Sequence, residues 1–225
     1  MNRVARELQT ILAGAAACIS RGRTGVALAG GGGLVATLLL APYDAQVLAW
    51  IQQSGANYRA AAEWISQFGR FENSLLMSAL VAGAIAIVTR SPRWRDVAVA
   101  VLVAALVAGL AIGVLRPTFG RARPDAGVAA GFYWFEADEQ LHSLPSGYVA
   151  SNAAAAFALV PLLPPLLVPA VAYTGAMAWS RMQLNRHYPT DVMWGAILGA
   201  TVGLAIGTSI RDRRRRLRST SDARS

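Results

Sequence analysis

Residues 148–181 read YVASNAAAAFALVPLLPPLLVPAVAYTGAMAWSR, a long apolar stretch interrupted by Pro164 and Pro165. Two helices that meet at this proline pair would each have about 17 residues and a length of about 25 Å, because an α-helix rises 1.5 Å per residue. A membrane-spanning helix needs roughly 17–25 residues to cross a hydrocarbon core about 30 Å thick. The stretch therefore predicts two antiparallel membrane helices, with one end of the pair recessed below the membrane surface.

Four more apolar stretches flank this pair, at about residues 24–41, 73–89, 97–115 and 190–210. We therefore expect an all-α membrane protein with six transmembrane helices. The composition agrees, since 55% of the 225 residues are hydrophobic and 15% are charged, whereas soluble domains carry about 25% charged residues. Disorder and collagen-like repeats are excluded, and the single cysteine, Cys18, excludes a disulfide-stapled scaffold.

All 21 basic residues are arginines, and their distribution predicts the orientation of the spans. The N-terminal arm (1–23), the loop after the second span and the C-terminal tail (211–225) share one side and carry 14 arginines, against 7 on the other. The positive-inside rule makes the richer side cytoplasmic. We expect a six-span domain at 24–210 in a bacterial inner membrane, with both termini cytoplasmic. The basic tail is explained as an anchor beside anionic lipids, so no nucleic-acid partner is expected.

Three further segments have helical patterns. Short interfacial helices are expected between the first and second spans, in residues 43–73, because apolar residues recur there at helical spacings. Residues 11–19 favour an interfacial amphipathic helix over a cleaved signal peptide. Glycines recur every fourth residue in the third and sixth spans, at Gly109, Gly113, Gly195, Gly199, Gly203 and Gly207. This spacing predicts close helix packing within the chain rather than dimerisation.

Polar residues gather at the ends of four spans that this topology places together on the outer side. They are Arg116 and Arg123 after the third span, Ser146 and Gly147 before the fourth, Arg181 ending the fifth, and His187 and Asp191 around the start of the sixth. Arginine forks onto phosphate oxygens, and a helix N-terminus opened by glycine favours an anion. Histidine can act as nucleophile or acid–base, and a carboxylate can orient its ring. The set predicts phosphate chemistry.

Three segments resemble the signature of the type 2 phosphatidic acid phosphatase family, which reads KxxxxxxRP, PSGH and SRxxxxxHxxxD. Here the first runs from Arg116 to Pro124 with arginine for lysine, the second is 145–148 with tyrosine for histidine, and the third, 180–191, is complete. The resemblance implies that His187 attacks phosphorus to form a phosphohistidine and that Asp191 holds its tautomer. The groups it implies for binding the phosphoryl oxygens are Arg116, Arg123, Arg181, Ser146 and the Gly147 amide. It implies a membrane-bound lipid phosphatase without metal or cofactor.

Tyr148 stands where the family has its general acid. A phenol has a reference pKa of about 10 and releases its proton reluctantly, whereas general acid catalysis is worth roughly 10²–10⁴-fold. The chain's other histidine, His142, lies six residues upstream and could supply the proton.

Three hypotheses follow from this replacement, whether natural or engineered. The first is an active lipid phosphatase that uses Tyr148 or His142 as proton donor. The second is an enzyme whose leaving group needs little protonation, acting on a polyprenyl diphosphate or as a lipid phosphotransferase. The third is an inactive relative that binds phospholipid headgroups, against which the retained His187 and Asp191 argue.

A channel or transporter is the alternative from another class. It would need polar groups at the bilayer midplane, but the first three spans contain no charged residue. We therefore expect membrane lipids and a lipid phosphate, presented from the outer leaflet, as partners. Phosphatidate, phosphatidylglycerophosphate, a polyprenyl diphosphate and lipid A all fit these residues.

Overall fold

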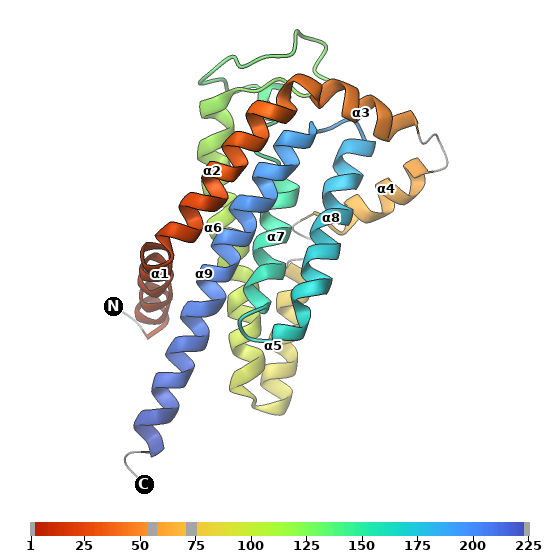
Figure 1. Cartoon of the computed structure of the whole chain (residues 1–225). Coiled ribbons are helices and arrows are strands. Elements are labelled where there is room, and N and C mark those ends of the chain that lie inside the picture. The colour runs from red at the N-terminus through yellow and green to blue at the C-terminus, as the bar shows by residue number, and fades with distance from the viewer. Residues whose placement is uncertain (1–2, 54–57, 71–75, 223–225) are drawn as a thin grey trace.

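The computed structural model describes residues 3–53, 58–70 and 76–222, and within these ranges the regular structure is helical (Figure 1). The α-helices are α1 Arg3–Arg21, α2 Arg23–Leu40, α3 Asp44–Gln53, α4 Arg59–Gln67, α5 Leu76–Thr89, α6 Pro92–Phe119, α7 Gly147–Leu159, α8 Leu167–Gln183 and α9 Pro189–Asp222. The predicted all-α fold is confirmed. The predicted second span begins in residues 71–75, which lie outside the described part of the chain.

Six spans are borne out only in part. Three stretches are long and apolar enough to cross a membrane: 23–53, which joins α2 to α3, then α6, and 189–217 within α9. Helices α5, α7 and α8 have 14, 13 and 17 residues, which is less than the roughly 20 residues of a typical span. The chain does turn between α7 and α8 at the predicted proline pair, where Pro164–Leu166 form a 3-10 turn.

Helices α3 and α4 form within the segment where short helices were expected, and α9 extends well past the expected end of the sixth span. The N-terminal helix α1 covers the predicted segment 11–19 and packs along α9. Ile11 is fully buried there, and its carbonyl oxygen accepts a hydrogen bond of 2.9 Å from the Ser209 hydroxyl. One face of α1 is thus part of the bundle.

The glycine series of α9 packs directly against α7. A Cβ atom at Gly199 would lie 2.4 Å from the carbonyl oxygen of Ala150, and the other three glycines face carbonyl oxygens of residues 146–158 at 2.2–2.7 Å. The prediction of close packing is therefore confirmed for the sixth span. It is wrong for the third, because Cβ atoms at Gly109 and Gly113 would meet no described atom within 4 Å. These two glycines face outward from α6.

The direction of the helices brings the motif residues together. Both termini lie at one end of the bundle, and the loop between α6 and α7 lies at the other (Figure 1). The C-terminal ends of α6 and α8 and the N-terminal ends of α7 and α9 share that second end. Four segments far apart in sequence therefore surround one site.

Candidate active site

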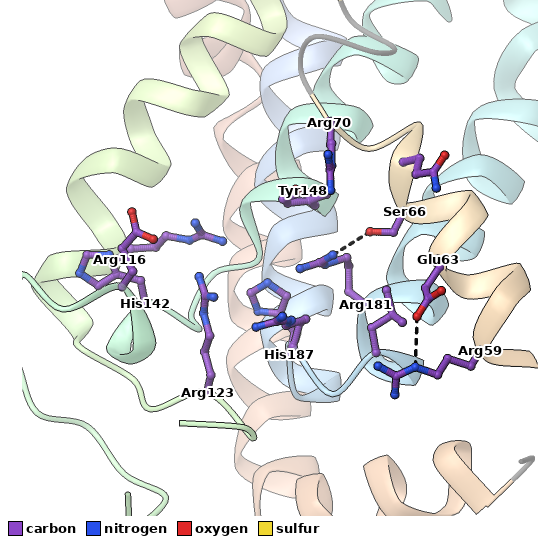
Figure 2. A pocket seen from close by; sticks show the side chains of 14 residues that line it. Arg59, Glu63, Ser66, Arg70, Arg116, Arg123, His142, Tyr148, Arg181 and His187 are labelled. Atoms are coloured by element: carbon purple, nitrogen blue, oxygen red, sulfur yellow. Dashed lines mark hydrogen bonds and ion pairs between the residues drawn. The ribbon is translucent and has the colours of Figure 1, made fainter. Parts of the chain in front are cut away.

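A cavity of about 690 Å³ lies at this end of the bundle, with α4 forming one wall (Figure 2). Five of the sequence-predicted residues line it: Arg116, Arg123, Tyr148, Arg181 and His187. The other lining residues are Arg59, Glu63, Ser66, Gln67, Arg70, Glu139, His142, Leu184 and Arg186. The α4 wall was not predicted as part of the site, because its polar residues match no motif.

Arg116 is held against the start of α7. Its Nε donates a 3.0 Å hydrogen bond to the Pro145 carbonyl oxygen. A Cβ atom at Gly147 would lie 2.9 Å from Arg116 Nη2, so a larger residue there would displace the guanidinium from its present position. The absence of a side chain at residue 147 thus places a positive charge beside the first amides of a helix, where an anion is favoured.

Three polar groups in the site lack a partner. Arg123 Nε, Arg181 Nε and the Ser146 hydroxyl are buried and form no hydrogen bond with the part of the chain that the structure describes. A buried polar group left unsatisfied costs about 1–3 kcal/mol, and these donors come from three different segments. Their number and sign fit the oxygens of a bound phosphate.

Ser146 is the N-cap residue of α7. Its backbone N–H donates a 3.0 Å hydrogen bond to the carbonyl oxygen of Asp191. The beginnings of α7 and α9 are therefore tied to each other beside the site. Asp191 itself is fully buried and does not line the cavity.

His187 is buried, and its Nδ1 lies 2.9 Å from the carbonyl oxygen of Ser143. A carbonyl only accepts, so Nδ1 carries the proton and the lone pair is on Nε2. Burial lowers the pKa of His187 well below its usual value, and the charges of Arg116, Arg181 and Arg123 lower it further. The ring is therefore neutral at pH 7, with Nε2 available as a nucleophile.

Asp191 was expected to hold the tautomer of His187 directly. Its Oδ2 lies 3.9 Å from His187 Nδ1 and accepts hydrogen bonds from the Ser143 hydroxyl at 2.6 Å and the Tyr188 amide at 2.8 Å. The Ser143 carbonyl makes the close contact with the ring, and Asp191 holds Ser143. Sequence reasoning missed Ser143, because every residue has a backbone carbonyl and a contact made by one cannot be predicted from the residue type.

Arg121 connects this arrangement to α3 and was also missed. Its Nη1 donates to Asp191 Oδ1 at 2.5 Å and its Nη2 to Asp44 Oδ2 at 2.6 Å. Asp44 in turn accepts a 3.1 Å hydrogen bond from the backbone N–H of Thr190 in the first turn of α9. Arg121 could have been noticed because it lies two residues before Arg123, whereas Asp44 has no signal beyond its position after the first span.

Tyr148 and His142 both line the cavity but have different surroundings. The ring centre of Tyr148 lies 4.1 Å from the guanidinium carbon of Arg181, a cation–π contact. The Nε2 of His142 lies 2.8 Å from the carbonyl oxygen of Glu136. The loop histidine is thus already placed at the site.

Comparison with known proteins identifies the family to which this chain belongs. The profile of the PAP2 superfamily matches residues 97–215, more than half of the chain. The chain belongs to the PAP2 superfamily. It is thereby a phosphoric ester hydrolase, and the resemblance that rested on three short motifs is confirmed.

Two relatives and one solved structure illustrate the family. Decaprenylphosphoryl-5-phosphoribose phosphatase of Mycobacterium tuberculosis, from each of two strains, is 38% identical over 164 residues, which cover 71% of this chain and 84% of the relative. The crystal structure of a transmembrane PAP2-type phosphatidylglycerolphosphate phosphatase from Bacillus subtilis superposes with a TM-score of 0.60 at 16% identity. That superposition covers 84% of this chain and 94% of the other. It shows that the two proteins share the PAP2 fold.

Proposed function

We propose that this PAP2 phosphatase removes the terminal phosphate from a lipid-linked phosphosugar, through a phosphohistidine on His187. The arrangement of a neutral, buried His187 among three unpartnered donors carries the proposal for the chemistry. The substrate class is supported by the 38% identical relative, whose name describes a phosphorylated ribose on a decaprenylphosphoryl group.

The cavity is larger and more basic than one phosphate requires. Six arginines and two glutamates line it. Arg59 is paired with Glu63 and Arg186 with Asp125, but the net charge still exceeds the two negative charges that a phosphomonoester carries at most. A substrate with a second, non-reacting phosphoryl group and a sugar would use the remaining charge and the polar side chains of α4. This surplus favours a phosphosugar lipid over phosphatidate.

In the proposed reaction, Nε2 of His187 attacks phosphorus, and the bond from phosphorus to the sugar oxygen breaks. Arg116, Arg123, Arg181, Ser146 and the Gly147 amide hold the phosphoryl oxygens, whose charge grows in the transition state. Asp191 acts through Ser143, which holds Nδ1–H. Water then attacks the phosphohistidine, releases phosphate and restores the neutral ring.

We also propose that the site faces outward from a bacterial inner membrane. The opposite end of the bundle carries the termini and the arginine-rich end of α9 (Figure 1), which the positive-inside rule places in the cytoplasm. Substrate would then enter from the outer leaflet. Labelling a single cysteine introduced at exposed Val128, in a Cys18→Ser background, with an impermeant maleimide on intact cells tests this; protection of the residue until the cells are lysed would contradict it.

The first experiment measures phosphate release by the purified protein from four lipids: a prenylphosphoryl-5-phosphoribose, phosphatidate, phosphatidylglycerophosphate and a polyprenyl diphosphate. We expect the phosphosugar lipid to have the highest kcat/KM. His187→Ala should lower it by at least about 10³-fold, whereas Arg93→Ala at the other end of α6 should have no effect.

Two results would oppose the proposal. Preference for the diphosphate, or transfer of phosphate to an acceptor alcohol in place of water, would favour the second hypothesis derived from Tyr148. Binding of phospholipid vesicles without turnover of any of the four lipids would favour an inactive relative.

A further inference from the structure

We propose that His142 is the proton donor of the reaction, a role that rests on the proposed function. The chain contains two histidines, they lie 45 positions apart in sequence, and both line the same cavity. One serves as the nucleophile. The other belongs to the loop between α6 and α7, outside the positions that the family motifs mark.

The leaving group creates the need for a donor. When the bond from phosphorus to a sugar hydroxyl breaks, the oxygen leaves as an alkoxide unless a proton reaches it in the transition state. The arginines of the cavity are permanently protonated and do not serve as acids. Glu63 forms an ion pair with Arg59 at 3.1 Å. Histidine is the side chain that both gives and takes a proton near neutral pH.

Tyr148 is the competing donor, and its contact argues for another role. Its ring lies against the Arg181 guanidinium at 4.1 Å, where the aromatic face stabilises the cation. This contact and the 2.7 Å hydrogen bond from Arg181 Nη1 to Ser66 Oγ fix the guanidinium from two sides. The structure thus uses Tyr148 as a platform for a phosphate-binding arginine.

His142 is oriented by its own hydrogen bond. It follows the 3-10 turn Glu139–Leu141, and its Nε2 lies 2.8 Å from the Glu136 carbonyl oxygen. Nε2 therefore carries a proton, and Nδ1 is the nitrogen that exchanges one. This is the same device, a ring nitrogen held by a carbonyl, that orients His187 with the opposite nitrogen engaged.

Figure 2 shows the positions of the two rings. In this view the Arg123 side chain stands between His142 and His187, with Arg116 on the His142 side. A phosphate held by Arg123 would have the nucleophile on one face and His142 on the other, as in-line displacement requires. The charged and titratable groups that share the cavity with His142 come from every element around it: Arg59 and Glu63 of α4, Arg70 after α4, Arg116 of α6, Arg123 of the loop, Glu139 of the 3-10 turn, Tyr148 of α7, Arg181 of α8, and Arg186 and His187 before α9.

The proton balance closes over the two steps. His142 enters the first step as an imidazolium, with a proton on each ring nitrogen. In this step the bond between His187 Nε2 and phosphorus forms, the ester bond breaks, and the His142 Nδ1 proton moves to the sugar oxygen. In the second, neutral His142 takes a proton from water, the new oxygen–phosphorus bond forms, and the nitrogen–phosphorus bond breaks. Phosphate leaves, and both histidines return to their starting protonation.

The test compares leaving groups. Kinetics are measured on two phosphomonoesters. One is the phosphate of a sugar alcohol, whose leaving oxygen needs a proton, and the other is p-nitrophenyl phosphate, whose leaving group needs little protonation. His142→Ala should lower kcat for the sugar phosphate by about 10²–10⁴-fold and for the aryl phosphate by less than about 10-fold. Val128→Ala, an exposed change in the same loop, should match the parent on both substrates.

A rescue experiment separates chemistry from loop structure. Tyr148→His in the His142→Ala background restores a histidine to the other side of the cavity, and it should recover part of the lost rate on the sugar phosphate. The proposal is overturned by equal losses of His142→Ala on both substrates, or by its full activity. It is also overturned if Tyr148→Phe, rather than His142→Ala, shows the dependence on leaving group. A parent that hydrolyses neither substrate would refute the proposed function itself.

Discussion

Replacement of Arg121 by glutamine tests the buried charge network beside His187. The Arg121 side chain is 11% exposed and lies between two buried carboxylates, Asp44 and Asp191. Removing the cation leaves two buried negative charges without a counterion, and breaking a buried ion pair typically costs about 3–5 kcal/mol. Asp191 keeps its hydrogen bonds from Ser143 and Tyr188, so we expect the lower end, about 3 kcal/mol.

For a chain of this length, 3 kcal/mol corresponds to a fall in Tm of about 6–12 °C. Thermal unfolding in one detergent is measured for the parent, Arg121→Gln, Asp44→Asn and the double variant. The double variant removes one of the two stranded charges, so its loss of stability should be smaller than the sum of the single losses by about 1–3 kcal/mol. Arg186→Gln is the control, because the exposed ion pair with Asp125 should contribute no more than about 1 kcal/mol.

Either of two results would refute the claim that Arg121 neutralises two buried carboxylates. One is an Arg121→Gln variant that unfolds within about 1 kcal/mol of the parent, which would mean that solvent screens both carboxylates. The other is strict additivity in the double variant, which would mean that Asp44 and Arg121 act independently.

Two other predictions concern helix packing and the nucleophile. Gly199→Ala places a methyl group 2.4 Å from the Ala150 carbonyl oxygen and should destabilise the bundle by about 1–3 kcal/mol. Gly109→Ala, in open space, should stabilise it by up to about 1 kcal/mol. Equal melting temperatures for the two variants would contradict this difference. Because burial and the charge of Arg116 lower the pKa of His187 below its ordinary value of 6.5, the ring takes up a second proton only at a pH below that value. The acid limb of kcat/KM should therefore lie below pH 6.5 and move to higher pH in Arg116→Met, and a midpoint at or above pH 6.5 in the parent would count against this.

The part of the site that could be predicted consists of residues whose types carry the chemistry. Arginines, a histidine and a glycine at helix ends indicate phosphate binding by themselves, and the alternation of spans places those ends together. Five of the eight predicted site residues line one cavity, whereas Ser146, Gly147 and Asp191 are not among its lining residues. The proline pair predicted the turn between α7 and α8, and the glycine series predicted the close packing of α9, because each pattern has a direct steric consequence.

The remainder depends on contacts that residue types do not encode. Ser143 acts through its carbonyl and through a hydroxyl whose partner, Asp191, is 48 positions away in sequence, and Asp44 acts through a partner 77 positions away. The outward glycines of α6 have the same spacing as the packed glycines of α9, since a four-residue period marks a helix face without saying what covers it. Short apolar helices such as α7 likewise satisfy the pattern of a span without its length.

The packing of α7 on α9 fixes the positions of the two helix starts that border the candidate site. A Cβ atom at Gly195 would lie 2.7 Å from the Ser146 carbonyl oxygen, so the two backbones are in contact in the second turn of α9. That contact permits the 3.0 Å hydrogen bond from the Ser146 amide to the Asp191 carbonyl. The start of α7, which we propose to bind phosphate, and the segment that carries His187 are therefore held together by contacts between their backbones.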